Sequence, residues 1–149
     1  MRISRFDRER DYPDMVNAWD AYDWTPAPPD VLPRMGFVAR TSSDSQFLAY
    51  MGIYLDEGGN VGMPEWTVAN PDVECELTSK ALENLFNVCK RTAQARGFLY
   101  LMSFTANKGW GRKLKSYGMT EGEKDCTTYV MGVEDDVKID FMLDGGSNG

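Results

Sequence analysis

The side chains that this sequence offers for chemistry are carboxylates, tyrosines and three cysteines, because its 149 residues include no histidine. Catalytic triads that need histidine and histidine-ligated metal sites are therefore excluded. Cys75, Cys89 and Cys126 lie far apart and form no C-x-x-C pair, so no metal site is expected. We interpret them as small apolar side chains, with a nucleophile as the alternative, and expect a reducing, cytoplasmic compartment.

The net charge of the chain limits the kinds of partner that it can bind. The chain carries 23 acidic and 16 basic side chains, a net charge of −7, which argues against unspecific binding to nucleic acids or anionic membranes. No apolar run approaches the roughly 20 residues of a membrane span, and residues 1–7 lack the apolar segment of a signal peptide. Four basic residues gather in one short stretch, where a phosphate-bearing ligand or a solvated surface would explain them: Lys108, Arg112, Lys113 and Lys115.

The apolar spacing predicts the elements that position these side chains. A first strand at residues 2–6 precedes a helix that is capped by Asp11. A hairpin of residues 36–40 and 47–55 follows, because a polar turn separates two apolar runs. Residues 61–68 are predicted as the next strand, and the first half of the chain is therefore rich in antiparallel strands.

The second half is predicted to alternate helices and strands. Pro64 indicates a bulge or an unpaired edge within its strand. The apolar run 98–104 predicts a buried central strand that pairs parallel to an earlier one. Asn107 opens a short helix that Gly118 closes. A long helix between residue 72 and Gly97 presents one apolar stripe, formed by Leu77, Ala81, Leu82, Leu85, Phe86, Cys89 and Ala93.

Together these elements predict a mixed α/β (α+β) fold, with a central mixed sheet of about six or seven strands flanked by helices. We expect one domain at residues 1–133, with its last strand at 127–133, and an acidic, apolar C-terminal tail at 134–149. The tail alternates apolar and charged residues, so it either adds a strand to its own sheet or docks on a protein partner. Its candidate partner-binding residues are Val137, Ile139, Phe141 and Leu143.

The element order and two local patterns resemble the GCN5-related N-acetyltransferase (GNAT) superfamily over about residues 2–133. Asn107 and Gly118 keep the eleven-residue spacing of the family's fifth-strand and fourth-helix motif. Val68-Ala69-Asn70-Pro71-Asp72 is similar to the family's Val-x-Pro-Asp, with one extra residue. The resemblance implies the GNAT fold, and it implies that Val68, Ala69 and Asn107 would hold acetyl-CoA if that ligand binds.

The cofactor loop departs from the family. In active members a loop of Gln/Arg-x-x-Gly-x-Gly/Ala holds the pyrophosphate of acetyl-CoA by backbone N–H groups at a helix N-terminus. Glu74, Leu77 and Ser79 occupy these positions, so the glycines that allow close backbone approach are missing. Asp72, Glu74 and Glu76 would also repel a pyrophosphate, by roughly 3 kcal/mol for each like-charge contact near 6 Å.

The resemblance also implies catalytic residues. Family members often use a glutamate on the fourth strand as the general base, and Glu65 is its match, with a solvent-facing position as the alternative. Many members protonate the departing thiolate with a tyrosine seven residues after the motif asparagine, where this chain has Leu114. Tyr117, one helical turn further on, is the candidate substitute, and packing against its own helix is the alternative.

Two functions follow from the resemblance. Shortened GNAT-like proteins of bacteriophages, including an internal virion protein of short-tailed phages, lack the glycine loop and carry Leu-Lys where this chain has Leu114-Lys115. By this likeness the chain is a GNAT-fold protein with a degenerate acetyl-CoA loop. It would act without a cofactor through protein contacts, in a virion, another phage-type assembly or against a host target. The alternative is an active N-acetyltransferase that moves an acetyl group from acetyl-CoA to an amine.

Overall fold

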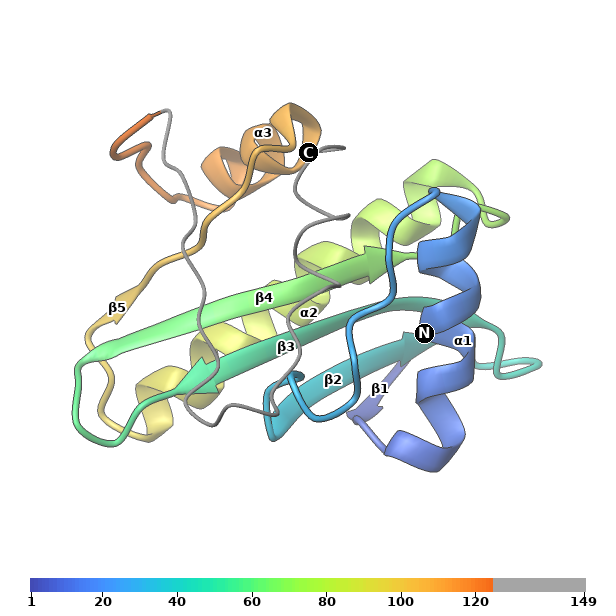
Figure 1. Ribbon diagram of the computed structural model, residues 1–149, viewed down its shortest axis with the longest axis horizontal. Coiled ribbons are helices and arrows are strands. Elements are labelled where there is room, and N and C mark those ends of the chain that lie inside the picture. The colour runs from blue at the N-terminus through green and yellow to red at the C-terminus, as the bar shows by residue number, and fades with distance from the viewer. Residues whose placement is uncertain (125–149) are drawn as a thin grey trace, which may run out of the picture. The chain divides into compact units, whose positions relative to one another are not determined.

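Figure 1 shows the computed structural model of the chain, which describes residues 1–124. The chain divides into two compact units, Met1–Phe104 and Thr105–Gly149. The first unit holds one sheet in the order β1-β2-β3-β4-β5, in which the first four strands are antiparallel and β5 is parallel to β4. Its strands are β1 (Arg2–Arg5), β2 (Met35–Arg40), β3 (Phe47–Leu55), β4 (Val61–Ala69) and β5 (Tyr100–Leu101).

The mixed α+β fold is confirmed, with five strands among the described residues where six or seven were expected. The predicted hairpin is β2 and β3, and its register is regular from Met35 to Ala39. The predicted strand at 127–133 and the predicted partner-binding tail, with Val137, Ile139, Phe141 and Leu143, lie outside the described residues.

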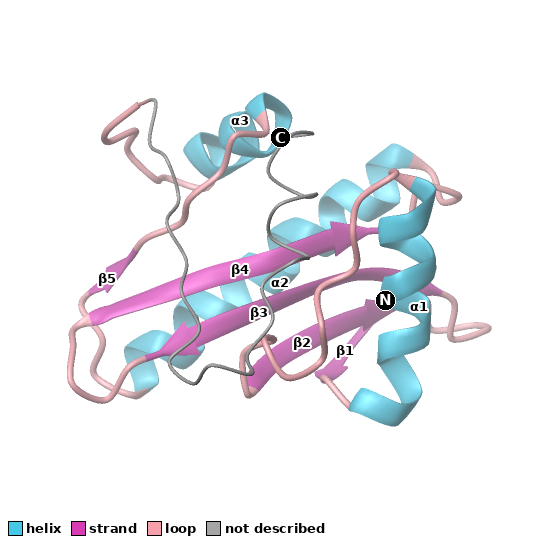
Figure 2. Ribbon diagram, in the orientation of Figure 1, coloured by secondary structure: helices cyan, strands magenta, loops and turns pink. Residues whose placement is uncertain are grey.

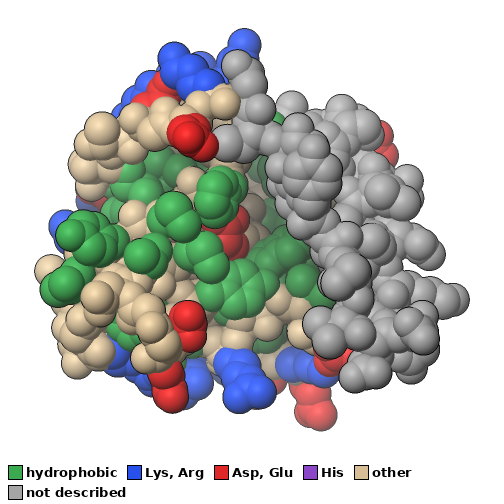
Figure 3. Space-filling view, turned by 60° about the vertical axis from the view of Figure 1, so that its left-hand side comes forward, with side chains coloured by type: hydrophobic (Ala, Val, Ile, Leu, Met, Phe, Trp, Pro, Cys, Tyr) green, Lys and Arg blue, Asp and Glu red, His purple; other side chains and the backbone are tan. Residues whose placement is uncertain are grey.

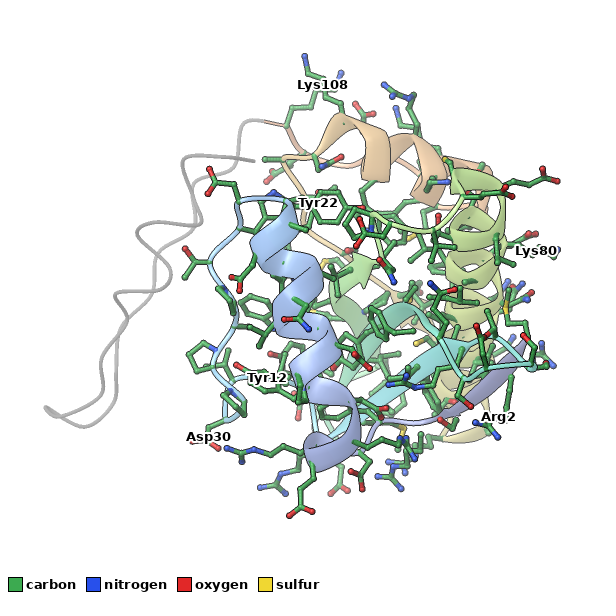
Figure 4. The ribbon with its side chains drawn as sticks, turned by 90° about the vertical axis from the view of Figure 1, so that its right-hand side faces the viewer. Arg2, Tyr12, Tyr22, Asp30, Lys80 and Lys108 are labelled. Atoms are coloured by element: carbon green, nitrogen blue, oxygen red, sulfur yellow. The ribbon has the colours of Figure 1, made fainter. Side chains whose placement is uncertain are left out.

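Two helices cover opposite faces of this sheet (Figures 2 and 4). α1 (Arg8–Ala21) lies on one face and α2 (Cys75–Ala95) on the other. Every residue from Phe47 to Ile53 in β3 is buried, as expected for a strand that is covered on both sides. α2 ends as predicted, because Gly97 adopts a φ of 81°. One core cluster joins α1 to the sheet and consists of Met15, Ala18, Trp19, Ala27, Leu32, Val38, Phe47, Tyr50 and Val68.

α1 begins one turn earlier than predicted. Asp7 is the N-cap, and its side chain accepts a hydrogen bond from the Arg10 N–H at 2.9 Å. Asp11, the predicted cap, lies inside the helix, where its carboxylate accepts from the Asp7 N–H at 2.8 Å. The two aspartates therefore serve the same helix start, one as the cap and the other as its reciprocal partner.

β4 contains a bulge. Tyr50 pairs with Val68 and Gly52 with Glu65, so β4 advances by three residues while β3 advances by two. Trp66 lies in the bulge with a φ of 58°, in the left-handed region that bulky side chains seldom occupy. Because of the bulge, the two ends of β4 pair with β3 in different registers, and Glu65 lies where the register changes.

Two local predictions differ from the structure. Pro64 pairs in register with Ile53, so the interruption of β4 lies beyond it rather than at it. Its carbonyl still accepts a bond on the β5 side, and only the missing N–H is lost from the ladder. Leu77, predicted on the buried stripe of α2, is 36% exposed, and Thr78 is buried instead. The Thr78 hydroxyl contacts backbone carbonyls of the preceding turn, which satisfies its polar group there.

β5 pairs parallel to β4, as predicted, but the expectation of a buried central strand is wrong. β5 is two residues long and lies at the edge of the described sheet. The adjoining apolar residues are exposed, with 69% for Leu99, 65% for Tyr100 and 60% for Phe104. Figure 3, turned to bring the β5 side forward, shows hydrophobic side chains gathered on this face. A continuous apolar run can form a buried strand or an exposed edge strand, and its sequence does not distinguish the two.

The second unit is described from Thr105 to residue 124 and contains α3 (Lys108–Ser116). Asn107 is its N-cap and accepts from the Trp110 N–H at 2.9 Å, while Gly118 follows the helix with a φ of 98°. Both predicted ends of this helix are therefore confirmed. None of the helices in the described part of the chain has the length and apolar character needed to cross a membrane.

Candidate functional site

Glu65 lies where the chain after β5 separates from β4. The Met102 N–H still donates to a backbone carbonyl of β4 at 2.9 Å. One residue further on, the Ser103 hydroxyl donates to the Pro64 carbonyl at 3.1 Å, and the Phe104 N–H then donates to the Glu65 carboxylate at 3.1 Å. Up to Met102 the two segments are joined by backbone hydrogen bonds, whereas at Ser103 and Phe104 each bond involves a side chain. The Glu65 carboxylate occupies the point at which the two segments part.

The surroundings of Glu65 raise the pKa of its carboxyl group. Burial raises the pKa of Glu65, and the hydrogen bonds from the Phe104 N–H and from Ser103 offset only part of this shift. Among the described residues, no lysine or arginine forms an ion pair with it. A half-buried carboxylate with a raised pKa is suited to accept and release protons of a bound group.

Tyr54 connects the β4 bulge to the loop between α1 and β2. Its hydroxyl donates to the Val31 carbonyl and accepts from the indole N–H of Trp66 at 2.7 Å. Gly52 pairs with Glu65 and lies two residues from Tyr54, so Tyr54 and Glu65 belong to the same face of the sheet. Burial raises the pKa of Tyr54, the bond from Trp66 lowers it in part, and the charge of Glu65 raises it further.

Tyr54 is the site residue that the sequence analysis did not single out. A signal was present in the alternation of β3, where residues 50, 52 and 54 share one face. Trp66, the hydrogen-bond partner of Tyr54, has the left-handed conformation. No local pattern of residue types predicts that conformation for a tryptophan.

The loop before α2 and the start of α2 differ from an anion-binding loop. The Asn70 side chain accepts from the Asp72 N–H at 3.0 Å and donates to the Phe47 carbonyl at 2.9 Å, which fixes the loop to β3. Glu74 occupies the N-cap position without a side-chain capping bond, and Glu76 lies in the first turn. Exposed carboxylates thus flank the first N–H groups of α2. The N-terminal end of α2 therefore fits a pyrophosphate poorly.

The other predicted site residues fall into two groups. Val68 is buried and pairs with Tyr50, and Ala69 is the last residue of β4. Asn107 and Tyr117 belong to the second unit, where the Asn107 side chain caps α3 and the Tyr117 ring lies edge-on to Trp110 with centroids 6.1 Å apart. The two units are described separately, so the roles proposed for Asn107 and Tyr117 stay predictions.

No protein-family model and no curated protein sequence matches the chain, but solved structures do. A probable acetyltransferase superimposes with a TM-score of 0.65 at 14% identity, over 91% of this chain and 100% of that chain. The ribosomal-protein-alanine N-acetyltransferase of Brucella melitensis biovar Abortus 2308 gives a TM-score of 0.60 at 21% identity, over 89% and 99%.

A third match is an aminoglycoside N-acetyltransferase, AAC(6')-Iy, in complex with CoA. Its TM-score is 0.61 at 15% identity, over 88% of this chain and 100% of that chain. Identities this low show a shared architecture and leave the activity to be argued from the site. The chain has the fold of the GNAT acetyltransferases.

Proposed function

We propose that this chain is an acyl-CoA-dependent N-acyltransferase in which Glu65 is the general base. The observation that carries the proposal is the half-buried Glu65 carboxylate, with its raised pKa, at the separation of β4 from the chain after β5. It would take the proton of the attacking amine while the C–N bond forms and the thioester C–S bond breaks. Tyr117 is the candidate for returning a proton to the thiolate.

The test of this proposal combines binding with turnover. Acetyl-CoA binding to the full chain is measured by calorimetry, and acetyl transfer to a panel of amines is followed by mass spectrometry. Glu65→Gln should keep the binding of acetyl-CoA and lose roughly 10²–10⁴-fold in turnover. Glu57→Gln, an exposed glutamate in the turn after β3, is the matched control. Turnover that is unchanged by Glu65→Gln would remove Glu65 from the mechanism.

A second candidate is a GNAT-fold protein that acts through protein contacts, in a phage-type assembly or against a host target. It is favoured by the exposed carboxylates of Asp72, Glu74 and Glu76 at the place where the family binds a pyrophosphate. The apolar side chains exposed along residues 99–104 also suit a protein contact. The tail residues Val137, Ile139, Phe141 and Leu143 would add to that contact.

A charge-neutralising variant separates the two candidates. If charge alone weakens binding, Asp72→Asn/Glu74→Gln/Glu76→Gln should bind acetyl-CoA at least tenfold more tightly than the wild type, because two or three like-charge contacts are removed. Glu9→Gln/Asp30→Asn/Glu57→Gln changes the net charge equally at exposed positions elsewhere. Absence of binding in the wild type and in both variants would remove the enzyme proposal and leave the second candidate.

A further inference from the structure

We infer that Tyr54 is the positioning residue of Glu65: through Trp66, it holds the β4 bulge in the conformation that sets the Glu65 carboxylate against the Phe104 N–H. The meaning of this coupling for catalysis rests on the proposed function. The coupling itself is a property of the folded chain and can be measured whether or not the chain transfers an acyl group.

Trp66 has a backbone conformation that needs support from its surroundings. Its φ of 58° is unfavourable for a residue with a bulky side chain, and such a conformation persists only where surrounding contacts enforce it. Trp66 packs against the core cluster between α1 and the sheet. Its indole N–H donates to the Tyr54 hydroxyl at 2.7 Å. Packing therefore fixes the ring, and the hydrogen bond fixes its rotation.

Tyr54 is itself anchored by its hydroxyl group. The hydroxyl that accepts from Trp66 donates to the Val31 carbonyl, so one oxygen atom joins β3, the β4 bulge and the loop between α1 and β2. A hydroxyl can donate one hydrogen bond, and here the Val31 carbonyl accepts it. The lone pair that faces Trp66 is thereby held in one direction. Loss of this hydroxyl removes both bonds together.

The bulge acts on Glu65, because Glu65 directly precedes Trp66. A change of φ at Trp66 rotates the adjoining peptide, and the pairing of Glu65 with Gly52 lies next to that rotation. The groups that face Glu65 are the Tyr54 side chain from β3 and, from the chain after β5, Ser103 and the Phe104 N–H. A shifted bulge would therefore move the carboxylate away from the Phe104 N–H and open it to water.

The Phe104 N–H provides a direct reporter, because it donates to the Glu65 carboxylate. We would follow the Phe104 amide chemical shift of the full, ¹⁵N-labelled chain from about pH 3 to about pH 8. In the wild type an inflection is expected above the ordinary glutamate value of about 4.3. Glu65→Gln should abolish this inflection, which assigns it to Glu65.

Tyr54→Phe removes the hydroxyl and keeps the ring. The Phe104 inflection should become smaller and move down toward the ordinary glutamate value, because the carboxylate moves away from this N–H and into water. Amide exchange of residues 66–68 should become about tenfold faster, as loss of two hydrogen bonds predicts. Trp66→Phe should shift both readouts in the same direction by less, because it removes the indole donor and keeps the bond from Tyr54 to Val31. The control is Tyr12→Phe: Tyr12 lies on α1 beside the loop that carries Asp30 (Figure 4), and its hydroxyl donates to the Ala27 carbonyl at 2.8 Å.

Tyr12→Phe should leave the inflection in place. An unchanged inflection in Tyr54→Phe and Trp66→Phe would overturn the inference, and so would an equal shift in Tyr12→Phe, since the loop as a whole would then be responsible. If the chain is active, Tyr54→Phe should shift the acidic limb of the kcat/KM profile by as much as the amide inflection, since both report the free enzyme. A wild type that transfers no acyl group would overturn the proposed function alone, because the amide titration would still report the coupling.

Discussion

Asp11 illustrates how much one buried side chain can contribute. It is fully buried and accepts hydrogen bonds from the Asp7 N–H, from two nitrogens of Arg10 and from Arg40. Burial raises the pKa of Asp11, but the bonds from Arg10, Asp7 and Arg40 outweigh it and hold the pKa below its ordinary value. The same Arg40 guanidinium also bonds to Asp14 at 2.6 Å, so both aspartates join α1 to the end of β2.

Asp11→Asn should lower the free energy of unfolding by about 1.5–3 kcal/mol at neutral pH, because the largely buried Arg40 loses one of its two charged partners and keeps Asp14. The folded pKa lies below the unfolded one, so the stabilisation is complete above about pH 4 and is lost as the pH falls through the folded value. Urea unfolding across this range should show the difference between wild type and variant shrinking in acid.

The matched control for this prediction is Asp30→Asn. It breaks the Arg8–Asp30 ion pair, in which the two side chains are 60% and 87% exposed. An exposed pair of this kind contributes less than about 1 kcal/mol, since solvent screens it. A loss in Asp11→Asn no larger than that in Asp30→Asn would contradict the role given to the buried carboxylate.

Glu65 should give the opposite dependence on pH. Its folded pKa is raised, so the folded state binds more protons than the unfolded state between the two values. Stability should therefore fall as the pH rises from the ordinary glutamate value through the raised one. Glu65→Gln removes this slope, and its unfolding free energy should gain on that of the wild type over the same interval. Parallel curves for the two proteins in denaturant titrations would show that Glu65 ionises as freely as in the unfolded chain.

At the scale of the elements, the sequence predicted most of what depends on local pattern. The β2–β3 hairpin, the end of α2 at Gly97 and the start of α3 at Asn107 follow from turn and capping residues next to apolar runs. The predictions were wrong where tertiary contacts determine the local structure. The bulge at Trp66 needs partners from β3, and the exposed edge at β5 has the pattern of a buried strand.

The candidate site divides in the same way. Glu65 could be nominated from its residue type on a predicted strand, together with a family resemblance. Its bond to Phe104 and its link to Tyr54 through Trp66 join residues that are distant in the sequence. Such contacts arise from strand register. Register depends on all the packing contacts of a strand together, so no local sequence pattern predicts it.

α3 offers a test of how its glycines act. A Cβ added at Gly111, inside the helix, would meet nothing within 4 Å, so Gly111→Ala should stabilise the helix by about 0.5–1 kcal/mol. Gly118 also has open space, but its φ of 98° strains any other residue, so Gly118→Ala should destabilise the same unit by about 1 kcal/mol. Helicity by circular dichroism and thermal unfolding would measure both. Equal effects of the two variants would mean that the backbone conformation of the glycine does not determine the change in stability.

At the scale of the whole molecule, charge and apolar exposure act against each other. The net charge of −7 makes copies of the chain repel one another, most strongly at low ionic strength. The exposed side chains of residues 99–104 favour association, as the apolar edge of a sheet does. Salt shortens the Debye length from about 30 Å at 0.01 M to about 8 Å at 0.15 M, so it weakens the first effect and leaves the second.

Self-association should therefore rise with salt in sedimentation experiments, and Leu99→Lys should reduce it. Leu99 is 69% exposed, so the substitution removes apolar surface at the β5 edge without opening a cavity in the core. Gln94→Lys, at an exposed position on α2, adds the same charge and leaves the apolar edge intact. Because both variants reduce the net charge equally, a weaker association in Leu99→Lys alone would identify the edge as the contact. Association that falls with salt, or that both variants alter alike, would point instead to attraction between charged surfaces.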